Sequence, residues 1–225
     1  MDAEYTRKRI PAEAAAGLLR SGTWIDYGMA LGMPVNFAAA LVQRKDDLRD
    51  VRIRGLTNTC QLAVVLEDPE QRAFSYSSWH FSGQERQWAA EGRCDYIPMA
   101  YQNKPEIYRK CLDVDMAVIS APPMDKHGYF NFSLVNSATM AILETAKIVI
   151  IEINEALPRT CGGFEECIHI RNVDHIIEGG RHALPELVPA QPGEVEMRIA
   201  EHIVRQMKDG SVIQLGIGGI PNSVG

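Results

Sequence analysis

The sequence predicts an α/β fold in which helices flank a parallel β-sheet, and three observations support this. A glycine-rich unit occurs twice, near the start and at the end of the 225 residues. Two short apolar runs rich in β-branched residues, 114–120 and 148–153, are typical of buried parallel strands. Between them, residues 138–146 have the pattern of a helix. Strands that alternate with helices predict a parallel sheet.

The repeated unit predicts two related domains. Its marker residues correspond pairwise: Gly22 with Gly210, Gly28 with Gly216, and Pro34 with Pro221. Each copy is typical of a helix, a turn at a glycine, a short apolar strand, a glycine loop and a helix that starts near proline. The two expected strands are residues 24–27 and 212–215.

The other elements follow from the same patterns. The first helix is expected at 11–19, a second helix at 36–43, and alternating strands at 51–56 and 74–80. Residues 194–208 form an amphipathic pattern that Gly210 would end. The predicted organisation is therefore a first domain (1–180), a linker (181–193) and the start of a second domain (194–225). We expect the chain to be part of a longer protein with a further C-terminal domain.

Composition limits the function classes. The chain is 46% hydrophobic and 23% charged, with a formal charge of -6. These values are typical of a soluble globular protein and argue against nucleic acid as the main partner. No apolar run approaches the roughly 20 residues of a membrane span, and the N-terminus lacks a signal-peptide core. Five widely spaced cysteines suggest reduced thiols, so we expect a cytoplasmic protein without a membrane partner.

The second glycine loop is the strongest candidate site. Glycines allow unusual backbone angles and close approach of a ligand, and free N–H groups at a helix start can bind an anion or oxyanion. The spacing matches neither a dinucleotide-binding fingerprint nor a P-loop. On spacing alone, a plain tight turn between strand and helix is equally compatible with this loop.

The residues around this loop resemble family I coenzyme A transferases. The segment QLGIGGIPNSVG (214–225) resembles their glycine loop, most closely in the butyryl-CoA:acetate and 4-hydroxybutyrate CoA-transferase branch, which is related to acetyl-CoA hydrolases. The segments WIDYG (24–28), SWHFSGQER (78–86), PMDKHGYFNF (123–132) and PRTCGG (158–163) agree. The resemblance runs nearly end to end and implies the first of two CoA-transferase domains plus the start of the second.

The resemblance also implies the site. The family's nucleophile is a glutamate shortly after the glycine loop, so it would follow Gly225 and no residue of this chain is expected to be the nucleophile. The residues implied to bind CoA and the oxyanion are Gln214, Leu215, Gly216, Ile217, Gly218, Gly219 and Ile220. Those implied for the acyl pocket are Gly28, His80, Glu85 and His127. For His80, His127 and Glu85, ordinary structural roles are equally compatible with the sequence.

A cysteine and histidine cluster and a single glutamate are the other candidate sites. Cys161, Cys167, His169 and His175 invite a zinc interpretation, but their spacing matches no standard finger, and 167–170 alternate like a strand. No metal is expected. Glu152 ends an apolar strand and is the best nucleophile candidate within the chain, although the resemblance places the nucleophile elsewhere.

The resemblance therefore implies transfer of coenzyme A between a short-chain acyl-CoA, such as butyryl-CoA, and a carboxylate such as acetate. A glutamyl-CoA thioester would carry the CoA. Acyl-CoA and small carboxylic acids are the expected partners, with no permanently bound cofactor, and the protein is expected to be a homo-oligomer. An acyl-CoA hydrolase and a non-catalytic CoA-binding subunit remain alternatives.

Overall fold

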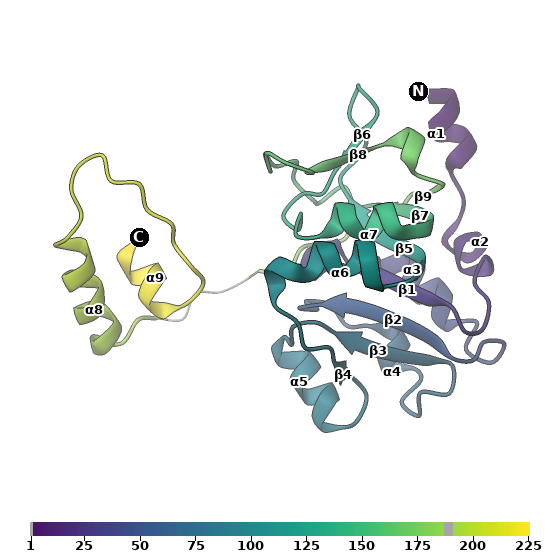
Figure 1. Cartoon of the computed structure of the whole chain (residues 1–225), viewed down its shortest axis with the longest axis horizontal. Helices are drawn as coiled ribbons and strands as arrows, with labels where there is room; N and C mark the ends of the chain where they lie inside the picture. The colour runs from purple at the N-terminus through teal and green to yellow at the C-terminus, as the bar shows by residue number, and fades with distance from the viewer. Residues whose placement is uncertain (1, 187–190) are drawn as a thin grey trace. The chain divides into compact units, whose positions relative to one another are not determined.

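The computed structural model describes residues 2–186 and 191–225 (Figure 1). The chain divides into two compact units, residues 1–184 and 185–225. Part of the predicted linker, residues 187–190, lies outside the described residues. Among the helices that the structure describes, none has the length and apolar character needed to cross a membrane.

A seven-stranded sheet organises the first unit, and all of its strand pairs are parallel. The strand order is β4-β3-β2-β1-β5-β7-β9. The strands are β1 (Trp24–Met29), β2 (Val51–Leu56), β3 (Phe74–Ser78), β4 (Asp95–Tyr96), β5 (Val114–Ala121), β7 (Ala146–Ile153) and β9 (His175–Ile177). Because β1 lies between β2 and β5, the direction of winding reverses there. Two further strands, β6 (Tyr129–Asn131) and β8 (Cys167–His169), form a small antiparallel sheet.

Helices cover both faces of this sheet, as predicted. Strand residues alternate between two buried clusters, so that Met116 and Val118 join one and Ala117 and Ile119 join the other. The first cluster contains residues of α2 (Ala12–Gly17), α3 (Val35–Val42), α4 (Ala63–Leu66) and α5 (Gly83–Ala90). The second contains residues of α6 (Lys104–Cys111) and α7 (Thr139–Thr145), which lie in front of the sheet in Figure 1.

The predicted α/β class is confirmed, and so are the main strands and helices of the first unit. Boundaries shift by a few residues: the strand expected at 74–80 ends at Ser78, and the helix expected at 36–43 is Val35–Val42. The patterns did not predict the shortest elements or the helix α1 (Asp2–Lys8). Elements of two to four residues, such as β4 and α4, are too short to establish a period.

The second unit differs more from expectation. It contains α8 (Glu194–Val204) and α9 (Gly219–Val224), so the predicted helix 194–208 ends four residues early. Gly210 has φ +82°, close to the +80° of Gly22, which confirms the two glycine turns. The prediction that residues 212–215 form a sheet strand is wrong. Val212 is 98% exposed, and within 191–225 the structure describes no strand that could satisfy its backbone groups.

Glu152 holds the start of α3 against β7. Its fully buried carboxylate accepts hydrogen bonds from the backbone N–H groups of Val35, Asn36 and Phe37, at 2.8, 2.9 and 2.8 Å. These are groups of the first helical turn that have no partner within the helix. Burial raises the pKa of this carboxyl, while the three N–H donors oppose that shift. The candidate nucleophile of the sequence is therefore a structural helix-capping residue.

We expect Glu152→Ala to lower the free energy of unfolding by roughly 3 kcal/mol or more, because three N–H groups lose their acceptor in a buried place. Glu152→Gln should lose less, since an amide oxygen still accepts. Urea denaturation measures both effects. Glu155→Ala, an exposed glutamate three residues on, is the matched control and should change stability by less than about 0.5 kcal/mol. Equal stability of Glu152→Ala and the control would contradict the capping role.

Candidate active site at the carboxyl ends of the strands

The reversal of winding at β1 identifies the edge of the sheet where a ligand would bind. In open α/β sheets, ligands bind outside the carboxyl ends of the strands at such a switch point. Gly28 lies near the carboxyl end of β1, and the 3₁₀ turn η1 (Ala30–Gly32) follows directly. A Cβ at Gly28 would lie 1.9 Å from the carbonyl oxygen of Gly32. Only glycine therefore lets the chain fold back so tightly here.

Unusual backbone angles gather at this edge. Ala30 follows β1 with φ +47°, Thr57 follows β2 with φ +50°, and Ser137 precedes α7 with φ +42°. A positive φ costs most for a β-branched residue such as threonine, and such strain often marks functional sites. Asp50 and Gln71 also have positive φ in turns away from this edge, so the angles support the site only together with the topology.

Glu85 fixes the loop after β2. Its carboxylate is fully buried and accepts bonds from the Tyr76 hydroxyl (2.7 Å) and the Asn58 backbone N–H (3.1 Å). It also accepts from the backbone N–H of Ser82 at 2.6 Å, while Ser82 caps α5 in return. Ser82 and Glu85 form a capping box at the start of α5. Glu85 also binds the backbone of Asn58, which follows the strained Thr57. The Glu85 carboxylate is thus engaged by three donors and holds this loop in place.

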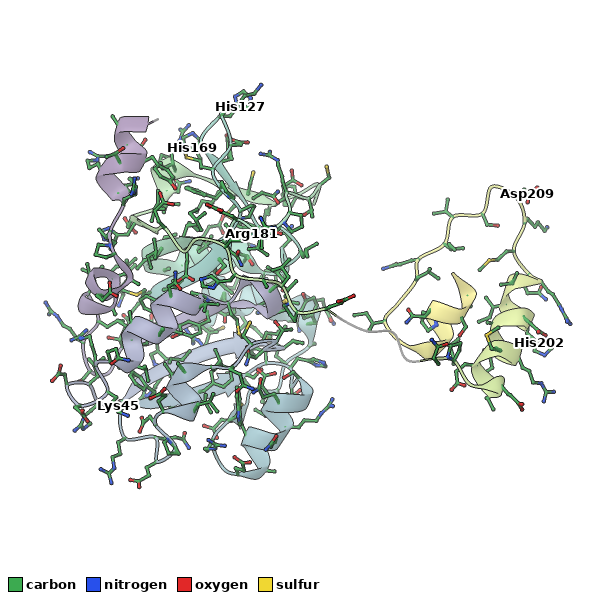
Figure 2. All side chains as sticks on the ribbon, turned by 180° about the vertical axis from the view of Figure 1, so that it is seen from behind. Lys45, His127, His169, Arg181, His202 and Asp209 are labelled. Carbon is green, nitrogen blue, oxygen red and sulfur yellow. The ribbon has the colours of Figure 1, made fainter. Side chains whose placement is uncertain are left out.

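The two predicted pocket histidines lie apart. His80 follows β3, its side chain is exposed, and its carbonyl accepts from the backbone N–H of Thr57 at 2.9 Å. His127 lies in the exposed turn before β6, and Figure 2 shows it at the tip of that turn, pointing away from the unit. Gly28, His80 and Glu85 thus belong to the carboxyl edge of the main sheet, and His127 lies on the turn of the small sheet.

A buried polar network lies beneath this edge, and sequence reasoning missed it. Arg54 donates from Nη2 to Asp26 at 2.6 Å, and the Tyr108 hydroxyl donates to the same carboxylate. Trp79 donates to the Tyr108 hydroxyl at 3.0 Å. Arg54 is a charged residue of the alternating strand 51–56, yet it is only 3% exposed. The signal that could have found the network is Asp26, a charge inside an otherwise apolar strand.

In the second unit, the glycine loop presents free backbone. Ile217 is 94% exposed, and Gly218 adopts φ +144° just before α9. The N–H groups of Gly216, Ile217 and Gly218 make no backbone bond with another described residue. At the start of α9, the backbone N–H of Asn222 donates to the carbonyl of Gly218, and Ser223 Oγ donates to the carbonyl of Gly219. The loop therefore offers backbone N–H groups that have no backbone partner among the described residues. Of the two neighbouring glycines, Gly218 has a positive φ and Gly219 does not.

The cysteine and histidine cluster gathers no ligand set. Cys167 and His169 lie on β8, and His169 Nδ1 accepts from the backbone N–H of Arg171 at 3.1 Å. Cys161 is exposed. Within residues 2–186 and 191–225, no group of three or more His, Cys, Asp or Glu side chains is arranged to hold a metal ion.

Fold and sequence together define the class. The model of the acetyl-CoA hydrolase/transferase N-terminal domain matches residues 1–187, and the chain belongs to this family. The resemblance to CoA-transferases is thereby confirmed.

Individual relatives agree with the family. The chain is 41% identical over 223 residues to a probable butyrate:acetyl-CoA coenzyme A-transferase of Syntrophomonas wolfei, covering 99% of this chain and 50% of that protein. It is 41% identical over 224 residues to the butyryl-CoA:acetate CoA-transferase of Anaerostipes caccae, with the same coverage. The crystal structure of RipA from Yersinia pestis aligns with TM-score 0.84 at 26% identity, over 99% of this chain and 54% of RipA. The chain thus spans about half the length of the curated relatives it matches.

We expect Glu85→Gln to loosen the loop at 57–60. Replacing the carboxylate removes charge-assisted bonds to Asn58 and Tyr76, each worth roughly 1.5–3 kcal/mol. The half-buried thiol of Cys60 should then react with an alkylating reagent at least about tenfold faster. Peptide mass spectrometry measures this rate. Glu91→Gln, at the exposed end of the same helix, is the control. An unchanged Cys60 rate in Glu85→Gln would show that the loop does not depend on this carboxylate.

Proposed function

We propose that the protein to which this chain belongs transfers coenzyme A between a short-chain acyl-CoA, such as butyryl-CoA, and a carboxylate acceptor such as acetate. The observation that carries the proposal is the 41% identity over 99% of the chain to two proteins named as transferases of this kind. The carboxyl edge at β1 would contribute to the acyl pocket, through Gly28, His80 and the loop held by Glu85. The protein would act in the cytoplasm as a homo-oligomer.

The proposed chemistry uses a glutamate that follows Gly225 in the complete protein. Its carboxylate attacks the thioester carbonyl, which forms an acyl-glutamyl anhydride and releases CoA thiolate. The thiolate then attacks the glutamyl carbonyl, forming a glutamyl-CoA thioester and releasing the acid. The acceptor acid runs these steps in reverse. The thioester energy is retained as long as water is kept from the anhydride.

In this scheme the glycine loop serves as the oxyanion site. Each step passes through a tetrahedral intermediate whose oxygen carries negative charge. This role of the N–H groups of Gly216, Ile217 and Gly218 is supported by the absence of backbone partners among the described residues, and for Gly216 and Ile217 by their exposure. One such donor contributes roughly 3–4 kcal/mol to catalysis when it is aimed at the developing charge. Gln214, Leu215, Gly219 and Ile220 would complete the CoA-binding surface.

Hydrolysis of acyl-CoA is the second candidate, because the family model covers hydrolases as well as transferases. The two activities share the first half of the chemistry. They differ in whether an acceptor carboxylate attacks the enzyme-bound intermediate and takes over the CoA, or water attacks it and the thioester energy is lost, so trapping the intermediate separates them.

We expect the complete protein, incubated with butyryl-CoA and no acceptor acid, to gain one CoA by intact mass. The thioester forms because the departing thiolate recaptures the activated glutamyl carbonyl. Borohydride should remove the CoA and reduce the glutamate to an alcohol, and peptide mapping should place this change after Gly225. Rapid release of free CoA without an adduct would favour the hydrolase, and modification of a cysteine would contradict the glutamyl mechanism.

We expect Gly218→Val to lower kcat of the complete protein about 10²–10³-fold, because it misplaces an oxyanion donor. A β-branched residue at φ +144° strains the loop, which accounts for part of any stability loss. Gly210→Val is the matched control: it imposes similar strain at φ +82°, with no atom within 4 Å of the added Cβ. Equal kcat for the two variants would show that the loop is only a turn.

A further inference from the structure

Lys104 is a buried cation without a counter-charge of its own. Its side chain is 2% exposed at the start of α6, and it forms no hydrogen bond or ion pair with any residue that the structure describes. The ammonium lies 5.9 Å from the centroid of the Tyr108 ring, which offers only a weak attraction at this distance. The ammonium is not among the fully buried polar atoms without a partner, so it keeps a small contact with solvent. Ammonium groups as buried as this one are normally paired, since each carries three donors that burial separates from most of their water.

The neighbouring carboxylate is already engaged. Asp26 is 1% exposed and accepts from Arg54 through Nε and Nη2, and from the Tyr108 hydroxyl. One negative and two positive charges therefore share the buried region around Asp26, Arg54 and Lys104. The excess positive charge is what an anion would neutralise.

A small cavity lies beside this lysine. It is lined by Lys104, Gly28, Trp79, Tyr108 and Ser137, among others, and so lies beneath the carboxyl ends of β1 and β2. Its volume of about 10 Å³ admits one particle of about the size of a water molecule. The exposed Tyr101 donates to the hydroxyl of Ser137 at 2.6 Å, so η2 (Tyr101–Asn103) is linked to a residue of the cavity wall.

We propose that Lys104 anchors a small monovalent anion in this cavity. The occupant is a halide, since it carries a single charge on one atom that accepts hydrogen bonds and is close in size to a water molecule. The site does not depend on the proposed function; a halide would make it a structural ion site.

The electrostatics agree with this assignment. Burial lowers the pKa of Lys104 to about 8, and the charge of Asp26 opposes that shift only in part. A bound anion would stabilise the protonated form, as a neighbouring negative charge does for any ammonium group.

Thermal unfolding at constant ionic strength tests the proposal. With potassium gluconate, whose anion is too large for the cavity, as the baseline salt, the protein should gain about 5 °C in Tm as chloride replaces gluconate to saturation. Formate, which is also larger than the cavity, should give no gain, and an equal gain with formate would contradict the halide site. Lys104→Met, of similar length without the charge, should abolish the dependence. Lys110→Met, on the exposed end of α6, should keep it.

Fluorescence gives a second measurement that needs no lysine variant. Bromide quenches tryptophan on contact, and Trp79, which is 6% exposed, lines the cavity. Bromide in place of gluconate should quench with a saturable component that Trp79→Phe removes. Identical melting in all three salts, or quenching that rises linearly without saturation, would overturn the anion site.

Discussion

The carboxylate of Glu152 is the contact on which the arrangement of the candidate site depends. It joins β7 to the first turn of α3, which immediately follows the tight bend after β1. Burial of a carboxylate is costly, and three backbone donors offset that cost only if the helix starts in one place. Ser120 adds a hydrogen bond to the Met33 carbonyl at 2.9 Å. The bend between Gly28 and Gly32 is therefore held from β5 and β7, the strands beside the switch point.

The buried charged side chains of this domain mainly fix the positions of backbone segments and strands. Glu85 and Glu152 each accept bonds from three donors and position backbone, in one case a loop and in the other a helix. Asp26 and Arg54 tie β1 to β2 across the same face. Such groups are expensive to bury, but they tolerate few alternative partners, and so they restrict how the strand ends are arranged. Lys104 is the exception, because its charge is buried without such a partner among the described residues.

The glycine loop and the carboxyl edge of the sheet are two different kinds of candidate surface. The loop offers exposed backbone donors that suit transient negative charge on oxygen. The edge offers strained turns, small residues and a rigid support, which suit the selection of a small organic group. In the proposed transfer of coenzyme A between two acids, the loop and the edge would supply these two functions. This division of roles is consistent with a family whose relatives are about twice as long as this chain.

The sequence by itself determined the fold class, because buried parallel strands and amphipathic helices each have a hydrophobic pattern that can be recognised within a short stretch of residues. Residues 114–120 and 148–153 are strands for that reason, and the turns at Gly22 and Gly210 follow from glycine's access to positive φ. The motifs around the glycine loop likewise indicated the family. Residues 212–215 show the limit: their apolar pattern permits a strand, but a strand also requires a hydrogen-bonded neighbour.

The roles of single charges were decided only by tertiary structure. Glu152 meets partners 115 to 117 residues away, and Glu85 meets Asn58 across 27 residues. Whether a carboxylate caps a helix, holds a loop or attacks a substrate depends on which distant donors surround it, and no local pattern contains that information.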